Sequence, residues 1–181
     1  MDKRLYEESI ILIGPSGAGK TAVAEKLEKM TNLAWKNLDE IANEAKRTIF
    51  RNRKVPTDEF NYYMLSTLLK RAQKNNFYGI VDFGGGHSVY DDENIFEKVK
   101  AMLKPFQNVV LLLPDKDEEK ALRIMNERAT GDTRDNRKFL ESPCNRELAT
   151  MVIYENNRKP SEIAQEILLR MKERKQQQEK E

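Results

Sequence analysis

A glycine-rich loop between a buried strand and a helix constrains the fold of this chain more than any other feature of its sequence. Residues 9–13 end in the apolar run Ile-Ile-Leu-Ile, which is typical of a strand buried on both faces of a parallel sheet. Residues 14–21 (Gly-Pro-Ser-Gly-Ala-Gly-Lys-Thr) break that pattern. From residue 21 to 30, apolar residues recur at helical spacing. The order strand, glycine loop, helix indicates the opening of a βαβ unit.

The loop fits the pattern G-x-x-x-x-G-K-[ST], and each residue type in it suits a nucleotide phosphate. Glycines let the backbone curl so that successive N–H groups point at an anion, and the N-terminus of the next helix favours negative charge. Lys20 would reach the β- and γ-phosphates, and the Thr21 hydroxyl would ligate Mg²⁺. We therefore expect ATP and Mg²⁺ to bind here; the alternative is a glycine turn that binds nothing. The predicted site comprises Gly14, Pro15, Ser16, Gly17, Ala18, Gly19, Lys20 and Thr21.

Further apolar runs with the length of strands alternate with helical patterns along the chain. Strands are predicted over residues 9–13, 33–38, 77–83, 109–113 and 151–154. Helices are predicted over residues 21–30, 40–50, 57–74, 91–103, 115–128 and 145–149, and after a cap at Ser161. This alternation implies a parallel sheet with helices on both faces. We expect one α/β domain over residues 1–174: a three-layer α/β/α fold of the P-loop NTPase type with a mostly parallel five-stranded sheet.

Two polar segments interrupt this pattern. Residues 129–142 are charged and lack periodicity, so we interpret them as a mobile loop or lid. Their basic residues include Arg134, Arg137 and Lys138, and a phosphoryl-transfer site needs cations that arrive when nucleotide binds. The alternative is a solvated charged face. Residues 175–181 are expected to form a disordered polar tail.

Composition excludes several classes of protein. The chain has 32 Lys and Arg and 30 Asp and Glu, and a net charge of +2 is no argument for nucleic acid or an anionic membrane as partner. One cysteine, Cys144, and one histidine, His87, exclude an intrachain disulfide, a multi-cysteine zinc site and a His-rich metal site. No apolar run approaches the roughly 18 residues of a membrane span. We expect a cytoplasmic monomer or weak dimer whose partner is a small molecule.

Acidic residues lie at the ends of two predicted strands, where ligands bind in open α/β sheets. Asp39 ends the second strand, so it could accept a proton from an attacking hydroxyl or hold that hydroxyl in line with the γ-phosphate. The alternative is an N-cap for the helix that follows. Asp82 lies near the end of the third strand and is a candidate for the Mg²⁺ site. Its alternative is a carboxylate bonded to neighbouring backbone.

Three consecutive glycines, Gly84, Gly85 and Gly86, follow the third strand. They remove side chains where a substrate could approach the backbone closely, and the alternative is simply a tight turn. The next residue is His87, which we interpret as a loop residue rather than a catalytic one.

In this order, the phosphate loop, strand-end aspartate, glycine triplet, basic segment and proline-initiated helix resemble the shikimate kinase family. The likeness extends from Ile10 to about Met171. It implies an ATP-dependent phosphotransferase that moves the γ-phosphate to a hydroxyl of a small molecule. By resemblance, Asp39 contacts the substrate hydroxyl, the glycine triplet contacts the substrate, Arg134 meets the phosphates and Arg128 lies near the adenine.

The acceptor half departs from that resemblance. The family holds its substrate carboxylate with two arginines, and Asn61 and Glu141 stand at the matching positions. A carboxylate would lose its charge-assisted bonds and would meet a like charge at Glu141. We therefore expect Asn61 to contact a different acceptor and shikimate to be a poor one. Compensating cations could come from Arg51, Arg53 or Arg146, and Asn37 replaces a further aspartate of the family.

Three functions fit these residues. The leading hypothesis is a small-molecule kinase in which Asp39 positions the acceptor while Lys20 and Arg134 stabilise charge on the transferring phosphoryl group. The second is a nucleoside or nucleotide kinase. Its base pocket would use Trp35, Tyr62, Tyr63, Asn61 and Asn37. The third is a catalytically inactive ATP-binding module that acts through partners; the lost arginines favour it, and the intact loop opposes it.

Overall fold

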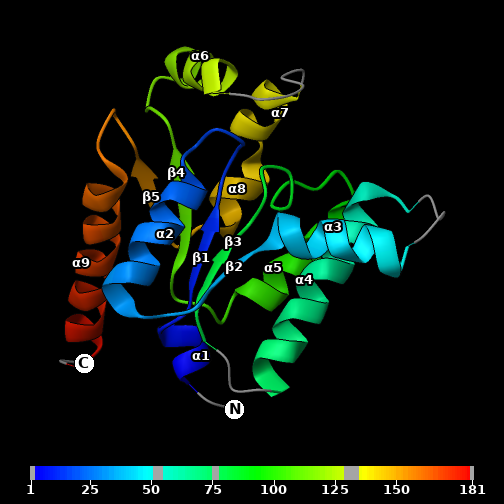
Figure 1. Cartoon of the computed structure of the whole chain (residues 1–181), viewed down its shortest axis with the longest axis horizontal. Coiled ribbons are helices and arrows are strands. Elements are labelled where there is room, and N and C mark those ends of the chain that lie inside the picture. Colours follow the sequence, from blue (N-terminus) through cyan, green and yellow to red (C-terminus); the bar gives the residue numbers. More distant parts are fainter. Residues whose placement is uncertain (1–2, 51–54, 75–77, 129–134, 180–181) are drawn as a thin grey trace.

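Five parallel strands form one sheet in the order β2-β3-β1-β4-β5 (Figure 1). The structure, a computed structural model of the full chain, describes residues 3–50, 55–74, 78–128 and 135–179. The strands are β1 (Ile10–Ile13), β2 (Trp35–Asn37), β3 (Ile80–Asp82), β4 (Val109–Leu113) and β5 (Met151–Tyr154). Their carboxyl ends meet at one edge of the sheet, so the glycine loop after β1 lies centrally at that edge.

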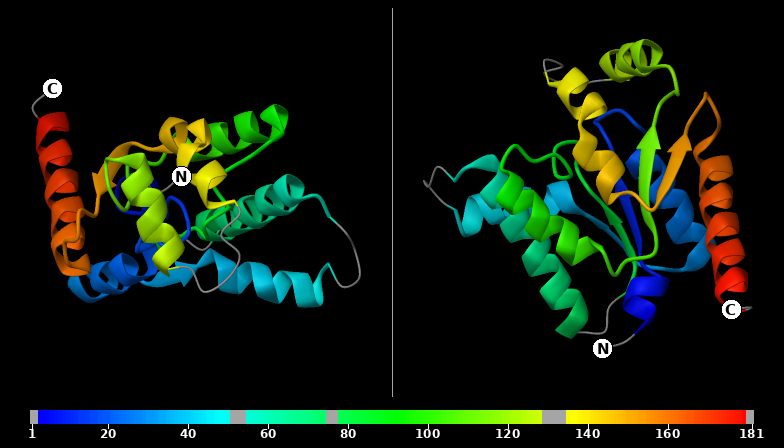
Figure 2. Two further views of the ribbon diagram at one scale, coloured as in Figure 1. Left: turned by 90° about the horizontal axis from the view of Figure 1, so that it is seen from above. Right: turned by 180° about the vertical axis from the view of Figure 1, so that it is seen from behind.

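Helices cover both faces of this sheet, which confirms the three-layer α/β fold. They are α1 (Arg4–Glu7), α2 (Lys20–Thr31), α3 (Leu38–Thr48), α4 (Thr57–Lys74), α5 (Glu93–Leu103), α6 (Glu118–Arg128), α7 (Asn136–Glu141), α8 (Pro143–Leu148) and α9 (Pro160–Gln178). Helices α2 and α9 pack on one face, while α3, α4, α5 and α8 pack on the other (Figure 2). Within the described part of the chain, every helix is too short or too polar to cross a bilayer.

Strand β1 is apolar throughout because both of its faces are buried. Side chains alternate between the two faces of a strand. Ile10 and Leu12 join the core under α2 and α9, whereas Ile11 and Ile13 join the core under α3 and α4. All four are at most 1% exposed, so neither face of this strand tolerates a polar residue.

The structure corrects the prediction for the segment before α8. Residues 136–141, expected as part of an irregular loop, form the helix α7. Two of its residues are buried: Leu140 joins the core, and Asn136 donates a 2.8 Å hydrogen bond to the Asn126 side chain. This tertiary anchoring supplies the order that the short polar sequence does not reveal. The remainder of the predicted lid, residues 129–134, lies outside the described residues.

Both ends of the chain also differ from expectation. The short helix α1 was not predicted; its Leu5 is buried in the core. Helix α9 begins at Pro160 after the cap residue Lys159, so Ser161 is in the first turn and is not the cap. The predicted disordered tail is helical as far as Gln178, because Lys, Arg, Glu and Gln are all good helix formers.

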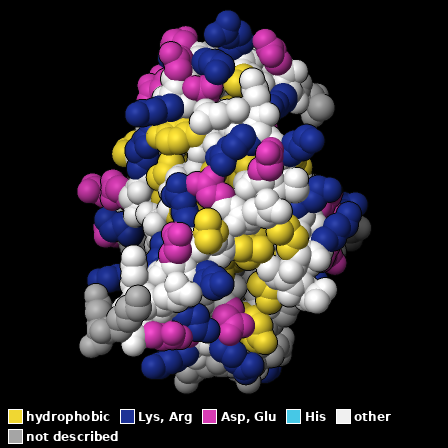
Figure 3. All heavy atoms as spheres, turned by 90° about the vertical axis from the view of Figure 1, so that its left-hand side faces the viewer, with side chains coloured by type: hydrophobic (Ala, Val, Ile, Leu, Met, Phe, Trp, Pro, Cys, Tyr) yellow, Lys and Arg dark blue, Asp and Glu magenta, His cyan; other side chains and the backbone are white. Residues whose placement is uncertain are grey.

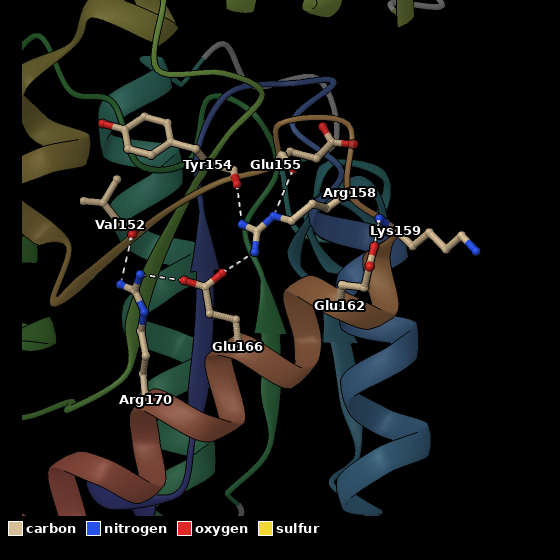
Figure 4. A network of polar contacts seen from close by, with 8 residues as sticks. All are labelled: Val152, Tyr154, Glu155, Arg158, Lys159, Glu162, Glu166 and Arg170. Carbon is tan, nitrogen blue, oxygen red and sulfur yellow. Dashed lines mark hydrogen bonds and ion pairs between the residues drawn. The ribbon is translucent and has the colours of Figure 1, made fainter.

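An ion-pair network ties the end of β5 to α9 (Figure 4). Arg158 donates to the carbonyls of Tyr154 and Glu155 and pairs with Glu166 at 2.5 Å. Glu166 pairs in turn with Arg170, which donates to the Val152 carbonyl. The backbone at Glu155, whose side chain shares Arg128 with the Gly17 carbonyl of the glycine loop, is therefore held by α9.

The outer face that carries α9 mixes charges of both signs. Figure 3 shows Lys and Arg side chains interspersed with Asp and Glu side chains over this face, with apolar side chains among them. Basic and acidic side chains are therefore balanced on this face as they are in the whole sequence, and the face is neither strongly positive nor strongly negative.

Candidate active site

The backbone path between β1 and α2 requires the glycines of residues 14–21. Gly14 has a φ of +131°, and a Cβ there would lie 2.4 Å from the Leu112 carbonyl oxygen of β4. Gly19, the residue before α2, has a left-handed φ of +75°. Glycine adopts such angles without steric cost, so the loop curls tightly against the sheet. The helix α2 begins directly afterwards, at Lys20.

Lys20 points into the curl of this loop. Its ammonium donates to the carbonyl oxygens of Gly14 and Pro15, both at 2.9 Å, and the residue is 7% exposed. Burial lowers the pKa of Lys20 below its ordinary value, and the nearby carboxylates of Asp82 and Asp39 oppose that shift. The cation is therefore held between loop carbonyls and two acidic residues. Of the remaining predicted loop residues, Ala18 is buried in the core under α2.

Thr21, in the first turn of α2, contacts Asp82, the last residue of β3. The Thr21 hydroxyl donates to Asp82 Oδ2 at 2.7 Å, so the partner of this carboxylate is a side chain and not neighbouring backbone, as the alternative interpretation had it. Burial raises the pKa of Asp82, which Lys20 counteracts. The other carboxylate oxygen, Oδ1, is buried without a hydrogen-bond partner among the described residues. A hydroxyl and an unpartnered carboxylate oxygen are the hard oxygen donors that Mg²⁺ prefers.

These residues fit a Mg²⁺ ion that takes most of its ligands from elsewhere. In the part of the chain that the structure covers, no group of three or more His, Cys, Asp or Glu side chains could hold a metal. Mg²⁺ commonly keeps several waters and is bound by one or two protein groups together with substrate phosphates. The pair Thr21 and Asp82 matches that mode of binding.

Asp39 lies in the first turn of α3 and is not its cap. The cap is Asn37, whose Oδ1 accepts a 2.9 Å hydrogen bond from the Asp39 backbone N–H. The Asp39 side chain is free for another contact, and its Oδ1 lies 3.0 Å from Nε2 of His87. This hydrogen bond holds the pKa of Asp39 below its ordinary value, against partial burial. The N-cap interpretation of Asp39 is therefore wrong.

Each glycine of the triplet faces a different neighbour. A Cβ on Gly84 would lie 1.9 Å from Asp39 Oδ1, and one on Gly85 would lie 2.6 Å from the Ser16 backbone nitrogen. At Gly86 the nearest atoms belong to the Phe139 ring, at 3.5 Å, which is an ordinary contact. Gly85 is needed because the glycine-loop backbone approaches it, whereas a side chain at Gly84 would displace the Asp39 carboxylate. The His87 N–H donates to the Gly84 carbonyl at 3.0 Å, so the segment also forms a turn.

Two cavities open at this edge of the sheet. The first, about 340 Å³, is lined by Ser16, Gly17, Gly19, Lys20, Thr21, Ala22, Asp39, Asp82, Phe83, Gly84, Gly85 and Arg128. The second, about 690 Å³, is lined by Asp39, Lys46, Phe50, Val55, Thr57, Phe60, Asn61, Gly86 and His87. Among the described residues, Asp39 alone lines both. A carboxylate therefore stands where a phosphate chain in one cavity would meet a group in the other.

Arg128 closes one side of the smaller cavity. Its guanidinium binds both carboxylate oxygens of Glu155, at 2.6 and 3.1 Å, and donates to the Gly17 carbonyl at 3.2 Å. The end of α6 is thus held against the loop and against the segment after β5. Arg134, the other basic residue expected at the phosphates, lies outside the described residues.

The residues predicted for the acceptor are only partly brought together. Asn61 is buried and lines the larger cavity, where its amide donates to the Gly86 carbonyl at 3.3 Å. Glu141 is not among the described lining residues and pairs with Arg137 on α7. Arg146 is likewise absent from that lining, and Arg51 and Arg53 lie outside the described residues. Of the five residues expected in a base pocket, only Asn61 lines this cavity.

The sequence prediction missed several residues of the larger cavity. Its rings are Phe50 and Phe60, and Lys46 lies 5.0 Å from the centre of the Phe60 ring. Lys46 follows Asp39 by seven residues, which is two helical turns along one face, so this signal was present. His87 was interpreted as a plain loop residue, but the structure places it on Asp39. The residues around His87 give no local signal for a contact with an aspartate 48 residues earlier.

A parallel sheet of this order, with a lysine-bearing glycine loop after its central strand, is typical of P-loop proteins, and a carboxylate shared by two cavities fits the small-molecule kinases among them. The chain belongs to the shikimate kinase family, whose family model matches residues 16–172. No curated protein sequence matches the chain.

Solved structures share the fold over nearly the whole chain. A shikimate kinase from Acinetobacter baumannii in complex with shikimate has a TM-score of 0.66 at 21% identity, covering 96% of this chain and 99% of that one. The shikimate kinase from Aquifex aeolicus has a TM-score of 0.61 at 20% identity, with 92% and 97% covered. A gluconokinase from Sinorhizobium meliloti 1021 reaches 0.60 at 18% identity, with 94% of each chain covered. These likenesses show the fold, and the family model shows the family.

Proposed function

We propose that this chain transfers the γ-phosphate of ATP to a hydroxyl group of a small molecule bound in the larger cavity. The observation that carries the proposal is the place of Asp39, which lines both cavities. Two-substrate transfer requires that donor and acceptor meet at one point. Asp39 lies at such a point, between the phosphate loop and a separate cavity.

The phosphate loop would hold the nucleotide through its backbone and Lys20. The carbonyls of Gly14 and Pro15 hold the ammonium inside the loop, and it would exchange these hydrogen bonds for phosphate oxygens when nucleotide binds. Thr21 and Asp82 would hold Mg²⁺. An ion held there would supply positive charge against the negative charge that develops on the transferring phosphoryl group. Arg128 would lie beside the nucleotide, held there by Glu155.

Asp39 would act on the acceptor hydroxyl. Because the His87 hydrogen bond lowers its pKa, Asp39 is ionised at neutral pH and is a hydrogen-bond acceptor only. An acceptor hydroxyl would donate to it and would thereby be turned so that its lone pair faces the γ-phosphate. Positioning of this kind contributes more to phosphoryl transfer than a strong base does, since little covalent chemistry falls to the protein.

The lining of the larger cavity supports an acceptor other than shikimate. It offers one described cation, Lys46, the polar groups of Thr57 and Asn61, and the rings of Phe50 and Phe60. The paired arginines of the family are replaced, so a ring carboxylate would be held by fewer charge-assisted bonds. A nucleoside is the second candidate, because the two rings and the Asn61 amide share this cavity. An inactive module is disfavoured, since Lys20, Thr21, Asp39 and Asp82 are all in place.

A thermal-shift screen tests this proposal. Hydroxylated metabolites and nucleosides would be added one at a time to the protein with saturating Mg-ADP. We expect Mg-ADP alone to raise the melting temperature and one class of acceptor to raise it further, because a ligand stabilises the state that it binds. That acceptor should then be phosphorylated with Mg-ATP. Absence of any stabilisation by Mg-ADP would contradict the proposal.

A further inference from the structure

We propose that His87 is a positioning residue: it fixes the Asp39 carboxylate so that one oxygen is held and the other faces the acceptor hydroxyl. This inference rests on the proposed function, because it takes the acceptor to bind at Asp39. It assigns a role to the only histidine of the chain.

The contact between the two side chains has a defined direction. An ionised carboxylate accepts hydrogen bonds and donates none. The 3.0 Å separation of Asp39 Oδ1 and His87 Nε2 therefore requires a proton on Nε2. The other ring nitrogen, Nδ1, is buried and has no hydrogen-bond partner among the described residues, so a proton there would have no acceptor. The imidazole is thus a donor that serves one acceptor, Asp39.

His87 is the more rigid member of the pair. Its side chain is 11% exposed, whereas that of Asp39 is 55% exposed. Its backbone N–H donates to the Gly84 carbonyl, and its carbonyl accepts from the Tyr90 hydroxyl at 2.9 Å. The next residue, Ser88, donates a buried 2.7 Å hydrogen bond to Asn145 on α8. The ring is therefore built into the loop, and it constrains the carboxylate rather than the reverse.

No other described group gives Asp39 a directed side-chain bond. The charged groups that face it are Lys20 from α2, Lys46 from its own helix and Asp82 from β3. These act on Asp39 by charge alone, and a Coulomb interaction at a distance does not select a side-chain rotamer. Without the His87 bond, a half-exposed aspartate in the first turn of a helix would sample several rotamers. The His87 bond selects the rotamer that holds the carboxylate where the two cavities meet.

A double-mutant cycle tests this role by its effect on turnover. His87→Leu removes the donor but keeps an apolar side chain of similar size, and His87→Gln places an amide donor close to the position of Nε2. The assay is Mg-ATP hydrolysis by the full chain, in which water takes the place of the acceptor. We expect His87→Leu to lower kcat by roughly 10- to 100-fold with the KM for ATP unchanged, as for a catalytic group misplaced by about 1 Å.

His87→Gln should recover most of this loss, and His87→Leu should cost nothing further in an Asp39→Asn background, because it acts through that carboxylate. Equal losses with and without Asp39, or a His87→Gln variant as slow as His87→Leu, would overturn the inference. A role in packing alone would lower the melting temperature of His87→Leu without this dependence on Asp39.

A second measurement needs neither turnover nor the folding of a variant at residue 87. Because the chain has one histidine, the ring N–H of a ¹⁵N-labelled sample is assigned without ambiguity. We expect an Nε2–H resonance that exchanges slowly with water in the wild type and is lost in Asp39→Ala. Its absence from the wild type, or its survival in Asp39→Ala, would overturn the inference. Calorimetry with Mg-ADP separates the two proposals. If Mg-ADP does not bind, the proposed function is wrong. If Mg-ADP binds but the Nε2–H resonance is absent from the wild type or survives in Asp39→Ala, only the role of His87 is wrong.

Discussion

The glycine loop and the larger cavity meet at Asp39, but different parts of the chain build them. The loop is one run of eight residues whose backbone path is set by left-handed glycines and close contact with β4. The cavity is lined by side chains from α3, α4 and the segment after β3. Two of its lining residues, Asp39 and His87, are in contact although they are 48 residues apart in the sequence. The loop, on the proposed nucleotide side, tolerates little change because its backbone path needs glycine, whereas the cavity, on the proposed acceptor side, is lined by separate side chains that can be changed one at a time.

The first prediction concerns the acceptor side and has the largest expected effect. Shikimate should be a poor acceptor, because Asn61 and Glu141 stand where the family has arginines. Each lost charge-assisted hydrogen bond costs on the order of 1.5–3 kcal/mol. Two such losses weaken binding by roughly 10²–10⁴-fold.

A coupled ATPase assay with shikimate measures this loss. Efficient, saturable turnover at sub-millimolar shikimate would contradict this prediction. The acceptor side would then bind the family's substrate without the two arginines. Alanine substitution of Arg51, Arg53 and Arg146, one at a time, would in that case identify the cation that replaces the missing pair.

On the nucleotide side, Lys20→Ala should lower Mg-ATP turnover by about 10²–10³-fold, the usual loss when one preorganised charge at a reacting centre is removed. Lys29→Ala is the matched control, since that lysine is exposed on the same helix and lies away from the loop. Steady-state assays with ATP compare the two. Retained activity in Lys20→Ala would mean that the loop does not bind the transferring phosphate.

The glycine triplet connects the two sides, and two neighbouring substitutions separate its roles. Gly85→Ala places a Cβ 2.6 Å from the Ser16 backbone nitrogen, whereas Gly86→Ala meets only the Phe139 ring at 3.5 Å. We expect Gly85→Ala to lose about 1–3 kcal/mol of unfolding free energy and to weaken Mg-ADP binding, as overpacking against backbone does. Gly86→Ala should change both by much less. Denaturant unfolding and calorimetry measure these effects, and equal effects would contradict the packing described.

The smallest expected effect is a gain in stability. Because burial raises the folded-state pKa of Asp82 above its unfolded value, its ionisation favours unfolding, and the stability present at low pH is lost as pH rises through the folded pKa. Asp82→Asn should therefore raise the melting temperature of the nucleotide-free protein at pH 7 by about 2–4 °C, the shift that ~1 kcal/mol gives in a domain of this size.

The same variant should lose the additional stabilisation that Mg²⁺ gives to the ADP complex. Glu173→Gln, an exposed substitution on α9, controls for the change in net charge. If Asp82→Asn is less stable than the wild type while its Mg²⁺ response is intact, Asp82 is a structural carboxylate and not a metal ligand.

The sequence predicted most of the fold because its signals are local. The strand over residues 109–113 is an apolar run closed by a proline, and the structure has β4 at these residues. The helix α7 was missed because its order depends on Asn136 and Leu140, which are buried by contacts with other elements. The length of α9 was underestimated because an exposed helical extension of charged residues has no apolar period to reveal it.

The candidate site likewise has one part that the sequence predicts and one part that it does not. Residues 14–21 and Asp82 follow from contiguous patterns of strand, loop and helix. The larger cavity does not, because Lys46, Phe50 and His87 become neighbours only when α3 and the segment after β3 pack together. A lone histidine in a glycine-rich loop carries no local signal that it will lie 3.0 Å from an aspartate 48 residues earlier.

In the proposed function, Asp39 serves the acceptor side and not the nucleotide side. Asp39→Asn tests it most directly, with Mg-ADP affinity measured by calorimetry and phosphoryl transfer from Mg-ATP measured on the acceptor found by thermal shift. We predict an unchanged dissociation constant for Mg-ADP and a loss of transfer of ~10²-fold or more, within the range for positioned acid–base groups. Unchanged transfer, or a loss that follows weakened nucleotide binding, would contradict the claim.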